Sequence, residues 1–322
     1  MGKKLSILIF ILTVSVIALM AVIRIAFTSG RIIPGYPFLL DRFLAEMRPI
    51  GGAKLAEQTA GRVLEVLEKR MANFGIENFS LDQKGTDKIQ IDIYNPSISP
   101  SYIRKLIVQI GSVEFGLLLD KDDLHKIGGA FNRYQKSINQ TALFYLHPRD
   151  DQALVLPVEF EDTLEKYLAT EKAMNIIGDP MISMIRDRNI IENKNHKYLT
   201  IYLVKKYKDF NQNHITDIKV KKDFISGDQL VLVFDETGRK ILTDLTNIHK
   251  GERLAIIIDG QVMSSPVMRE RITDGKVAVS GRTLGPNLKI LEATIKSGPL
   301  EIPIEIVKEE TKMEPRSLLR FF

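Results

Sequence analysis

The sequence predicts an α+β protein that begins with one transmembrane helix and continues into two extracytoplasmic subdomains. Three observations lead to this prediction. An uncharged apolar run lies near the N-terminus, a series of amphipathic helices and alternating strands precedes residue 120, and a second such series follows residue 200. The chain has 322 residues, which is enough for about two domains.

The composition excludes several classes of site. The chain is 44% hydrophobic and 26% charged, which is ordinary for a globular protein. The formal net charge is +5, but basic and acidic residues are interleaved, so we expect no basic stripe for nucleic acid. The absence of cysteine excludes disulfides, thiol catalysis and cysteine-ligated zinc.

The apolar run Leu5–Ile23 carries no charge and predicts a membrane span. At about 1.5 Å per residue it approaches the roughly 30 Å hydrocarbon core, and residues up to Phe27 can extend it. A cleaved signal peptide is the alternative, but its apolar region is shorter and ends at a small-residue cleavage site. Lys3 and Lys4 favour an N-terminus inside the cell. We therefore expect residues 1–30 to be a retained single-pass anchor.

Residues 31–50 form a juxtamembrane linker interrupted by prolines. Its apolar residues recur at helical spacing and predict a short helix: Leu39, Leu40, Phe43, Leu44 and Met47. Such a helix can lie on the bilayer surface or pack on the folded domain. We prefer packing, because helical spacing alone more often marks a face that packs against a core.

Residues 51–120 predict a ferredoxin-like base subdomain. After Gly51 and Gly52 comes a helix over 53–75, which Gly75 is placed to end with a left-handed cap. The expected elements that follow are strands at 78–83 and 88–95, a helix over 99–111 and a strand at 112–120. This order is most of a split βαβ unit, whose sheet has helices on one face and a free face on the other.

Residues 121–297 are assigned to a larger α+β head subdomain, and 298–322 to a strand that returns to the base and a tail. The first part of the head, 121–200, is less regular and is treated as an insertion. The expected elements of the head are helices over 161–178, 235–251 and 285–298 and strands at 197–207 and 228–235.

The stretch LAIIIDGQVMSSPVM (254–268) predicts a β-hairpin. Asp259 and Gly260 supply the positive φ angles that a two-residue turn requires, and Pro266 should end the strand pairing or lie at an edge. A second Asp-Gly turn is expected at Asp274 and Gly275.

The sequence contains no motif for catalysis. The five histidines form no metal-binding pattern, and GGAFNR (128–133) lacks the Lys-Ser/Thr of a phosphate loop, so a Gly-Gly turn is expected there. Ser264 and Ser265 follow a strand rather than precede a helix, which does not fit a nucleophile elbow. We therefore expect no catalytic, metal-binding or cofactor-binding residues and no enzyme activity.

The hairpin and its neighbours resemble the SecD half of the bacterial SecD/SecF protein-export accessory. RLAIIIDGQVMSSPVM (253–268) and ITDGKVAVSG (272–281) are similar to the family segments RLAIVLDGxVxSAPxI and ITGGxAxISG. Further segments match in the same order, including LEKRMANFGI (67–76), LVFDETGRKILTDLT (232–246) and IKSGPLEIPIEIVKEE (295–310). The signature turn and hairpin positions are then Gly51, Gly52, Gly75, Asp259, Gly260, Pro266, Asp274, Gly275, Gly281 and Gly298.

The resemblance implies a domain like the first large periplasmic domain of SecD, with its base and head. It implies binding of emerging unfolded secretory polypeptide, of the Sec translocon, or of a SecF-like or multi-span partner at the bacterial cytoplasmic (inner) membrane. Family members continue into five further spans that couple proton flow to export, and the sequence ends at Phe322 without them, so we expect no proton channel. The alternative is a structural or interaction subunit of another envelope complex that reuses this fold.

Overall fold

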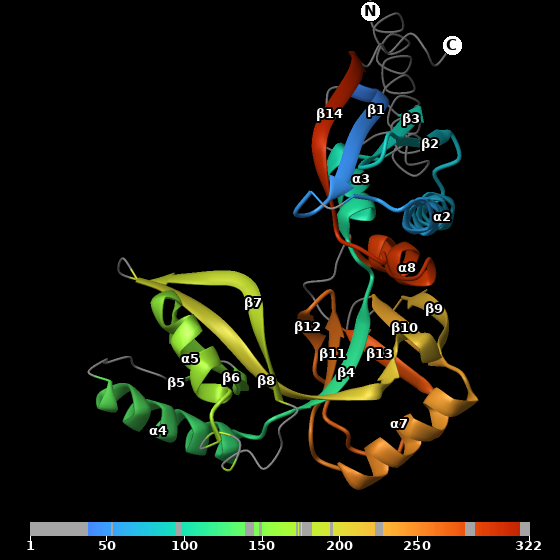
Figure 1. Ribbon diagram of the computed structural model, residues 1–322. Coiled ribbons are helices and arrows are strands. Elements are labelled where there is room, and N and C mark those ends of the chain that lie inside the picture. Colours follow the sequence, from blue (N-terminus) through green and yellow to red (C-terminus); the bar gives the residue numbers. More distant parts are fainter. Residues whose placement is uncertain are drawn as a thin grey trace, which may run out of the picture. The chain divides into compact units, whose positions relative to one another are not determined.

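The chain folds into two units, and the second is inserted into the first (Figure 1). The computed structural model describes residues 38–52, 54–94, 98–138, 145–147, 150–171, 173, 175, 182–193, 196–222, 228–280 and 287–315. The first unit takes the described residues up to Ile110 and from Pro299 onward, and the second unit is Gly111–Gly298. The segment Leu5–Phe27 lies outside the described residues, and no helix within the described part has the length and apolarity of a membrane span.

The first unit has ferredoxin-like topology. Its elements are β1 (Phe38–Pro49), α2 (Glu57–Phe74), β2 (Phe79–Lys84), β3 (Lys88–Tyr94), α3 (Pro100–Val108) and β14 (Ile304–Pro315). The sheet order is β14-β1-β3-β2, and every neighbouring pair is antiparallel. This is the βαββαβ arrangement of a split βαβ fold, with the whole second unit placed between α3 and β14.

The helix predicted around residues 39–47 is wrong, because this segment is strand β1. Phe43, Ala45 and Met47 are all at most 1% exposed and alternate with more exposed residues, which is the period of a strand. Apolar residues at 40, 43, 44 and 47 also fit the period of a helix, so their spacing alone could not distinguish a helix from a strand. Pairing with β14 on one side and β3 on the other decides it.

The strand predicted at 112–120 exists as β4 (Val113–Leu118), but it belongs to the second unit. It pairs with strands of that unit, and β1 and β14 complete the first sheet instead.

The sheet of the first unit has one apolar and one polar face. Val63, Leu67 and Met71 of α2 are fully buried. On the other face, ion pairs join neighbouring strands, including Arg42–Asp92, Lys88–Glu46 and Arg48–Glu305. The face expected to be free for packing is therefore charged rather than apolar.

The second unit contains two sheets. The larger has the strand order β12-β11-β4-β8-β6-β5, with β7 on the opposite edge of β8 from β6. Its further strands are β5 (Tyr145–His147), β6 (Asp150–Pro157), β7 (Ile182–Asn193), β8 (His196–Asn211), β11 (Leu254–Ile258) and β12 (Gln261–Ser264). The smaller sheet has the order β13-β10-β9, formed by β9 (Ile215–Lys221), β10 (Gln229–Phe234) and β13 (Lys276–Ser280).

The described part of this unit includes the α-helices α4 (Lys121–Ser137), α5 (Glu161–Leu168), α7 (Glu236–Ile248) and α8 (Leu288–Lys296). Single 3₁₀ turns lie at Val158–Phe160 and Gln212–His214. One core packs α4 and α5 on β6 and β8, around Phe131, Leu164 and Ile201. A second core packs α7 and α8 with strands of both sheets, around Phe115, Phe210 and Leu242.

Two local predictions in residues 121–200 are wrong. Gly128 and Gly129 lie inside α4 rather than in a turn. This helix begins at Asp120, whose side chain accepts a hydrogen bond from the Asp123 N–H, and its apolar residues keep helical spacing through the glycines. The helix predicted over 161–178 is also not continuous, since α5 ends at Leu168 and residues 171, 173 and 175 are helical again after a turn.

Candidate functional site

Strand β11, the first half of the signature hairpin, is buried on both faces. All five of its residues are buried. Leu254, Ile256 and Ile258 face the core formed with α7 and α8. Ala255 and Ile257 face a smaller cluster with residues of β4, β7 and β8. The continuous apolar run LAIII therefore reflects a strand between two cores, as expected for a strand with no solvent face.

The hairpin turn fastens the start of the second unit. Asp259 and Gly260 have φ angles of 49° and 70°, as a two-residue turn of the primed type requires. The Asp259 carboxylate accepts hydrogen bonds from the N–H groups of Gly111 and Ser112, at 2.7 and 2.9 Å. The Asp259 N–H in turn donates to the Ser112 carbonyl at 3.0 Å. The signature aspartate therefore shapes the turn and also holds the first residues of the inserted unit.

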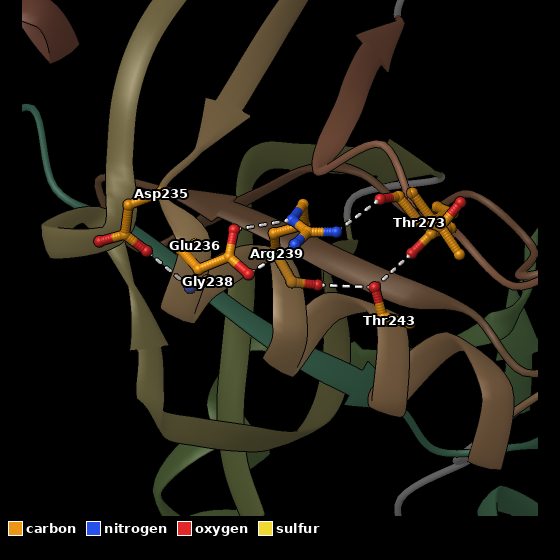
Figure 2. A network of polar contacts seen from close by, with 7 residues as sticks. Asp235, Glu236, Gly238, Arg239, Thr243 and Thr273 are labelled. Carbon is orange, nitrogen blue, oxygen red and sulfur yellow. Dashed lines mark hydrogen bonds and ion pairs between the residues drawn. The ribbon is translucent and has the colours of Figure 1, made fainter.

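Two other signature segments meet at α7, as Figure 2 shows. Asp235 caps the helix by accepting from the Gly238 N–H at 2.6 Å, and this hydrogen bond holds the pKa of the Asp235 carboxyl below its usual range. Arg239 pairs with Glu236 and donates to the Thr273 carbonyl at 3.4 Å. The Thr243 hydroxyl donates to the Ile272 carbonyl at 2.8 Å, which ties the loop before β13 to the helix.

The remaining signature positions lie at turns and element ends. Gly51 and Gly52 follow β1, Gly75 caps α2 and Gly298 follows α8. The Pro266 carbonyl accepts the Leu254 N–H just beyond the end of β12, and the Asp274 side chain accepts the Lys276 N–H. Gly275 has a φ of 66°, and a Cβ there would lie 2.9 Å from Cγ of Arg239. Gly281 lies outside the described residues.

The structure brings only some of these positions together. The Asp274–Gly275 turn contacts α7, and Asp259 contacts Gly111, whereas Gly51, Gly52 and Gly75 belong to the first unit. These positions shape the fold and do not converge on one pocket. Within the described residues, no group of three or more histidine, aspartate and glutamate side chains could hold a metal ion.

Sequence reasoning missed Arg70, which is 0% exposed on the inner side of α2. Its guanidinium donates to the carbonyls of Leu106, Gln109 and Ile110 at the end of α3, with distances of 3.1 Å to Leu106 and 2.6 Å to Ile110. The last carbonyls of a helix have no partner within the helix, so this arginine caps α3 from outside. A signal was present: Arg70 precedes Met71 on the apolar side of its helix and lies inside a segment that resembles the family.

Two of the open grooves in the described part of the second unit lie between helices and strands named above. One, of about 820 Å³, lies between α4 and the end of α5 and is lined in part by Tyr134 and Tyr167. The other, of about 440 Å³, lies where β7 begins beside β8, and is lined in part by the ion pair of Glu114 with Lys206.

The outer strands of the sheets also differ in character. The open edges of β2, β9 and β14 carry charged residues such as Asp82, Lys219 and Lys308, which discourage pairing with another strand. In contrast, β7 carries Ile190 and Ile191 near its end, just before Glu192 and Asn193, and these isoleucines are 48% and 38% exposed.

The family model and the similar proteins found by comparison all point to SecD or SecDF. Residues 187–302 match the family model of the SecDF P1 head subdomain. The protein translocase subunit SecD of Rhodothermus marinus is 22% identical over 293 residues, which cover 80% of this chain and 47% of that protein. The protein translocase subunit SecD of Endomicrobium trichonymphae is 23% identical over 265 residues, covering 81% and 49%. The chain is therefore similar to SecD over about 80% of its length, and to the SecDF P1 head subdomain at residues 187–302.

A crystal structure of SecDF in its super-membrane-facing form contains a region with a similar fold. Its TM-score is 0.52 at 18% sequence identity, and the match covers 89% of this chain and 33% of that chain. The chain thus spans about half the length of the curated SecD relatives it matches. Within the SecDF P1 head match lie β8 to β13, α7 and the signature hairpin, whereas α4, α5 and β6 lie before it.

Proposed function

We propose that the chain is a single-pass, membrane-anchored accessory of Sec protein translocation that binds emerging unfolded polypeptide or the translocon. The segment Leu5–Phe27 would anchor it in the bacterial inner membrane with the N-terminus inside, and both folded units would lie outside the cytoplasm. The similarity to SecD proteins, which are protein translocase subunits, supports this proposal. We propose no catalytic step, no cofactor and no proton channel for the described part of the chain.

The edge of β7 is the observation that carries polypeptide binding. The start of β7 lies beside β12, and the Gln261 side chain donates to the Arg186 carbonyl at 2.9 Å. Further along, Ile190–Asn193 pairs with β8 and with no second strand among the described residues. An extended polypeptide can add to such an edge through backbone hydrogen bonds with little sequence preference, and the exposed isoleucines add apolar contact.

The binding test compares an unfolded with a folded client. The full chain, purified in mild detergent, is titrated with a fluorescent secretory protein kept permanently unfolded and with the same protein folded. We expect a Kd near the micromolar range or weaker for the unfolded form, about −8 kcal/mol at most, and much weaker binding of the folded form. The affinity should persist at moderate salt, because screening removes mainly exposed charge interactions.

A matched pair of variants then tests the edge. Replacing Ile190 and Ile191 by lysine places charge on the free edge and should weaken binding, whereas Ile248→Lys changes an isoleucine that is 72% exposed at the end of α7 and should not. Equal affinity for folded and unfolded clients would remove the polypeptide-binding role. Co-purification from membranes with a different envelope complex, and without Sec components, would then favour the interaction-subunit alternative.

Membrane topology is tested separately. A reporter that is active only outside the cytoplasm is attached at Phe322, and activity is expected if the N-terminus is inside. An inactive reporter, or a mature N-terminus near residue 30, would overturn the anchor.

A further inference from the structure

The last segment of the first unit, residues 299–315, contributes little to the core of that unit. Between Pro299 and Lys312, where the structure describes the side chains, only Leu300 and Ile304 are buried. In comparison, β1 and β3 each bury at least three apolar side chains. Strand β14 is also a sheet edge, because it pairs with β1 and with no other strand of the described part (Figure 1). A strand with few buried apolar contacts and one partner belongs to the less stable parts of a fold.

Three ion pairs hold this segment to the rest of the unit. In each pair, an arginine from the N-terminal part of the unit donates to a glutamate of the segment: Arg62–Glu301, Arg48–Glu305 and Arg104–Glu309. The arginines come from three different elements, α2, β1 and α3, and the partners lie 239, 257 and 205 positions apart in the chain. The pairs of Glu301 and Glu309 are bidentate, which is the stronger geometry for an arginine and a carboxylate.

A β-bulge places these contacts on both sides of the sheet. The register between β1 and β14 shifts by one residue at Val307, and such a shift turns the side chains beyond it to the other face. Glu305, before the bulge, pairs with Arg48 on the open face of the sheet. Glu309, beyond the bulge, pairs with Arg104 of α3, on the helical side. The segment is therefore held by charges from both faces as well as by its backbone ladder.

These ion pairs are accessible to salt. Their six side chains are between 21% and 48% exposed. The hydrogen bonds from Arg62 hold the pKa of the Glu301 carboxyl below its usual range, so this carboxyl stays charged at neutral pH. Dissolved ions screen such half-exposed pairs far more than they affect buried apolar contacts. The attachment of the segment should therefore weaken as the ionic strength rises.

We infer that residues 299–315 form a releasable strap, which opens more often than the rest of the first sheet, and that the three arginine pairs set how often it opens. The second unit is joined to the first by two crossings, Ile110–Gly111 and Gly298–Pro299, and the second crossing leads directly into the strap. When the strap is open, the chain connects the second unit to the folded part of the first only at Gly111. Ionic strength thus shifts the balance between a doubly and a singly attached second unit.

Hydrogen exchange measured by mass spectrometry on the full chain in mild detergent tests this strap. Exchange of the protected amides in 304–312 is compared with that in 89–93 of β3, at about 0.1 M and about 1 M salt, where the screening length is about 10 Å and about 3 Å. We expect 304–312 to exchange faster than 89–93 at both salt concentrations. The higher salt should speed exchange of 304–312 about five- to tenfold, because it screens three half-exposed pairs of which two are bidentate. Exchange of 89–93 should change much less.

Charge reversal with rescue separates the ion pairs from the backbone ladder. Glu309→Arg should speed exchange of the strap a few-fold, because it places two arginines together. Adding Arg104→Glu to the same chain restores an opposite-charge pair and should recover most of the protection. Glu65→Arg is the matched control, since it makes the same change of charge but disrupts a pair with Lys69 inside α2. This control should leave exchange of the strap unchanged.

Two results would overturn the inference. One is a common exchange rate and a common salt response for 304–312 and 89–93, because the sheet would then open as one body. The other is a double variant that melts at the wild-type temperature but exchanges as fast as Glu309→Arg, because the charges would then not hold the strap. The salt comparison uses the wild-type chain, so it decides the question even where a variant fails to fold.

Discussion

Oδ1 of Asp259 lies 2.7 Å from the amide nitrogen of Gly111, a residue 148 positions earlier in the chain. The same oxygen accepts the Ser112 N–H at 2.9 Å. The signature turn and the first residues of the inserted unit are therefore one hydrogen-bonded structure. A substitution at Asp259 should disturb both.

Asp259→Ala should lower the free energy of unfolding by about 2–3 kcal/mol, because two N–H groups lose their acceptor and alanine is strained at positive φ. Asp259→Asn should cost less, since asparagine keeps the acceptor oxygen and tolerates the left-handed region. Denaturant unfolding of both variants measures the difference. Asp82→Ala, on the edge strand β2, is the surface control. Equal losses for the alanine and asparagine variants would show that the side-chain oxygen contributes nothing.

Arg70→Ala should cost about 3 kcal/mol or more, because it leaves several carbonyls at the end of α3 without a donor and opens a cavity in the core of the first unit. Arg70→Lys should fall between alanine and wild type, since one ammonium cannot reach all of these carbonyls. Thermal unfolding compares these variants with Lys69→Ala, the exposed neighbour paired with Glu65, which should change little. An Arg70→Ala melting temperature equal to that of Lys69→Ala would contradict the capping role.

Gly275→Ala and Gly260→Ala separate backbone strain from crowding. Both glycines have φ near 70°, so alanine costs roughly 1–2 kcal/mol at either position. At Gly275 the new Cβ would also meet Arg239, whereas at Gly260 nothing lies within 4 Å. We therefore expect the larger loss at Gly275, measured by denaturant unfolding. A second variant, Gly275→Ala with Arg239→Ala, should recover part of it. Equal losses for the two single variants would exclude crowding by Arg239.

The Arg42–Asp92 pair predicts a pH dependence of stability. Hydrogen bonds from Arg42 lower the pKa of the Asp92 carboxyl, with a further contribution from the Tyr94 hydroxyl. A lowered folded-state pKa means that the stabilisation is present above the unfolded pKa of about 3.9 and is lost as the pH falls through the folded value. The free energy of unfolding of wild type should thus exceed that of Asp92→Asn above about pH 5, and the gap should close below about pH 4. A gap that stays constant down to pH 2 would exclude this cause.

Local patterns in the sequence predict many elements but not their partners. The hairpin, α7 and its Asp235 cap follow from nearby residues, and the structure has them as expected. Strand β1 was predicted as a helix because its apolar spacing fits both periods, and only pairing with β14, more than 250 residues away, resolves it. The groove at Tyr134 and Tyr167 could not be predicted, since it depends on how two helices pack on β6 and β8. The role of Arg70 could not be predicted for the same reason, because the carbonyls that accept its hydrogen bonds lie at the end of another helix, α3.

The insertion of the second unit between α3 and β14 has a consequence for the order of folding during synthesis. The first sheet needs β14 next to β1, so it cannot be completed until β14 has been synthesised and released from the ribosome. The inserted unit can form as soon as residue 298 is available. Its two ends then lie close, since the Leu300 N–H donates to the Ile110 carbonyl at 2.8 Å, and a folded insert removes most of the entropy cost of closing so long a loop. Strand β1 therefore lacks its partner on one side until β14 pairs with it.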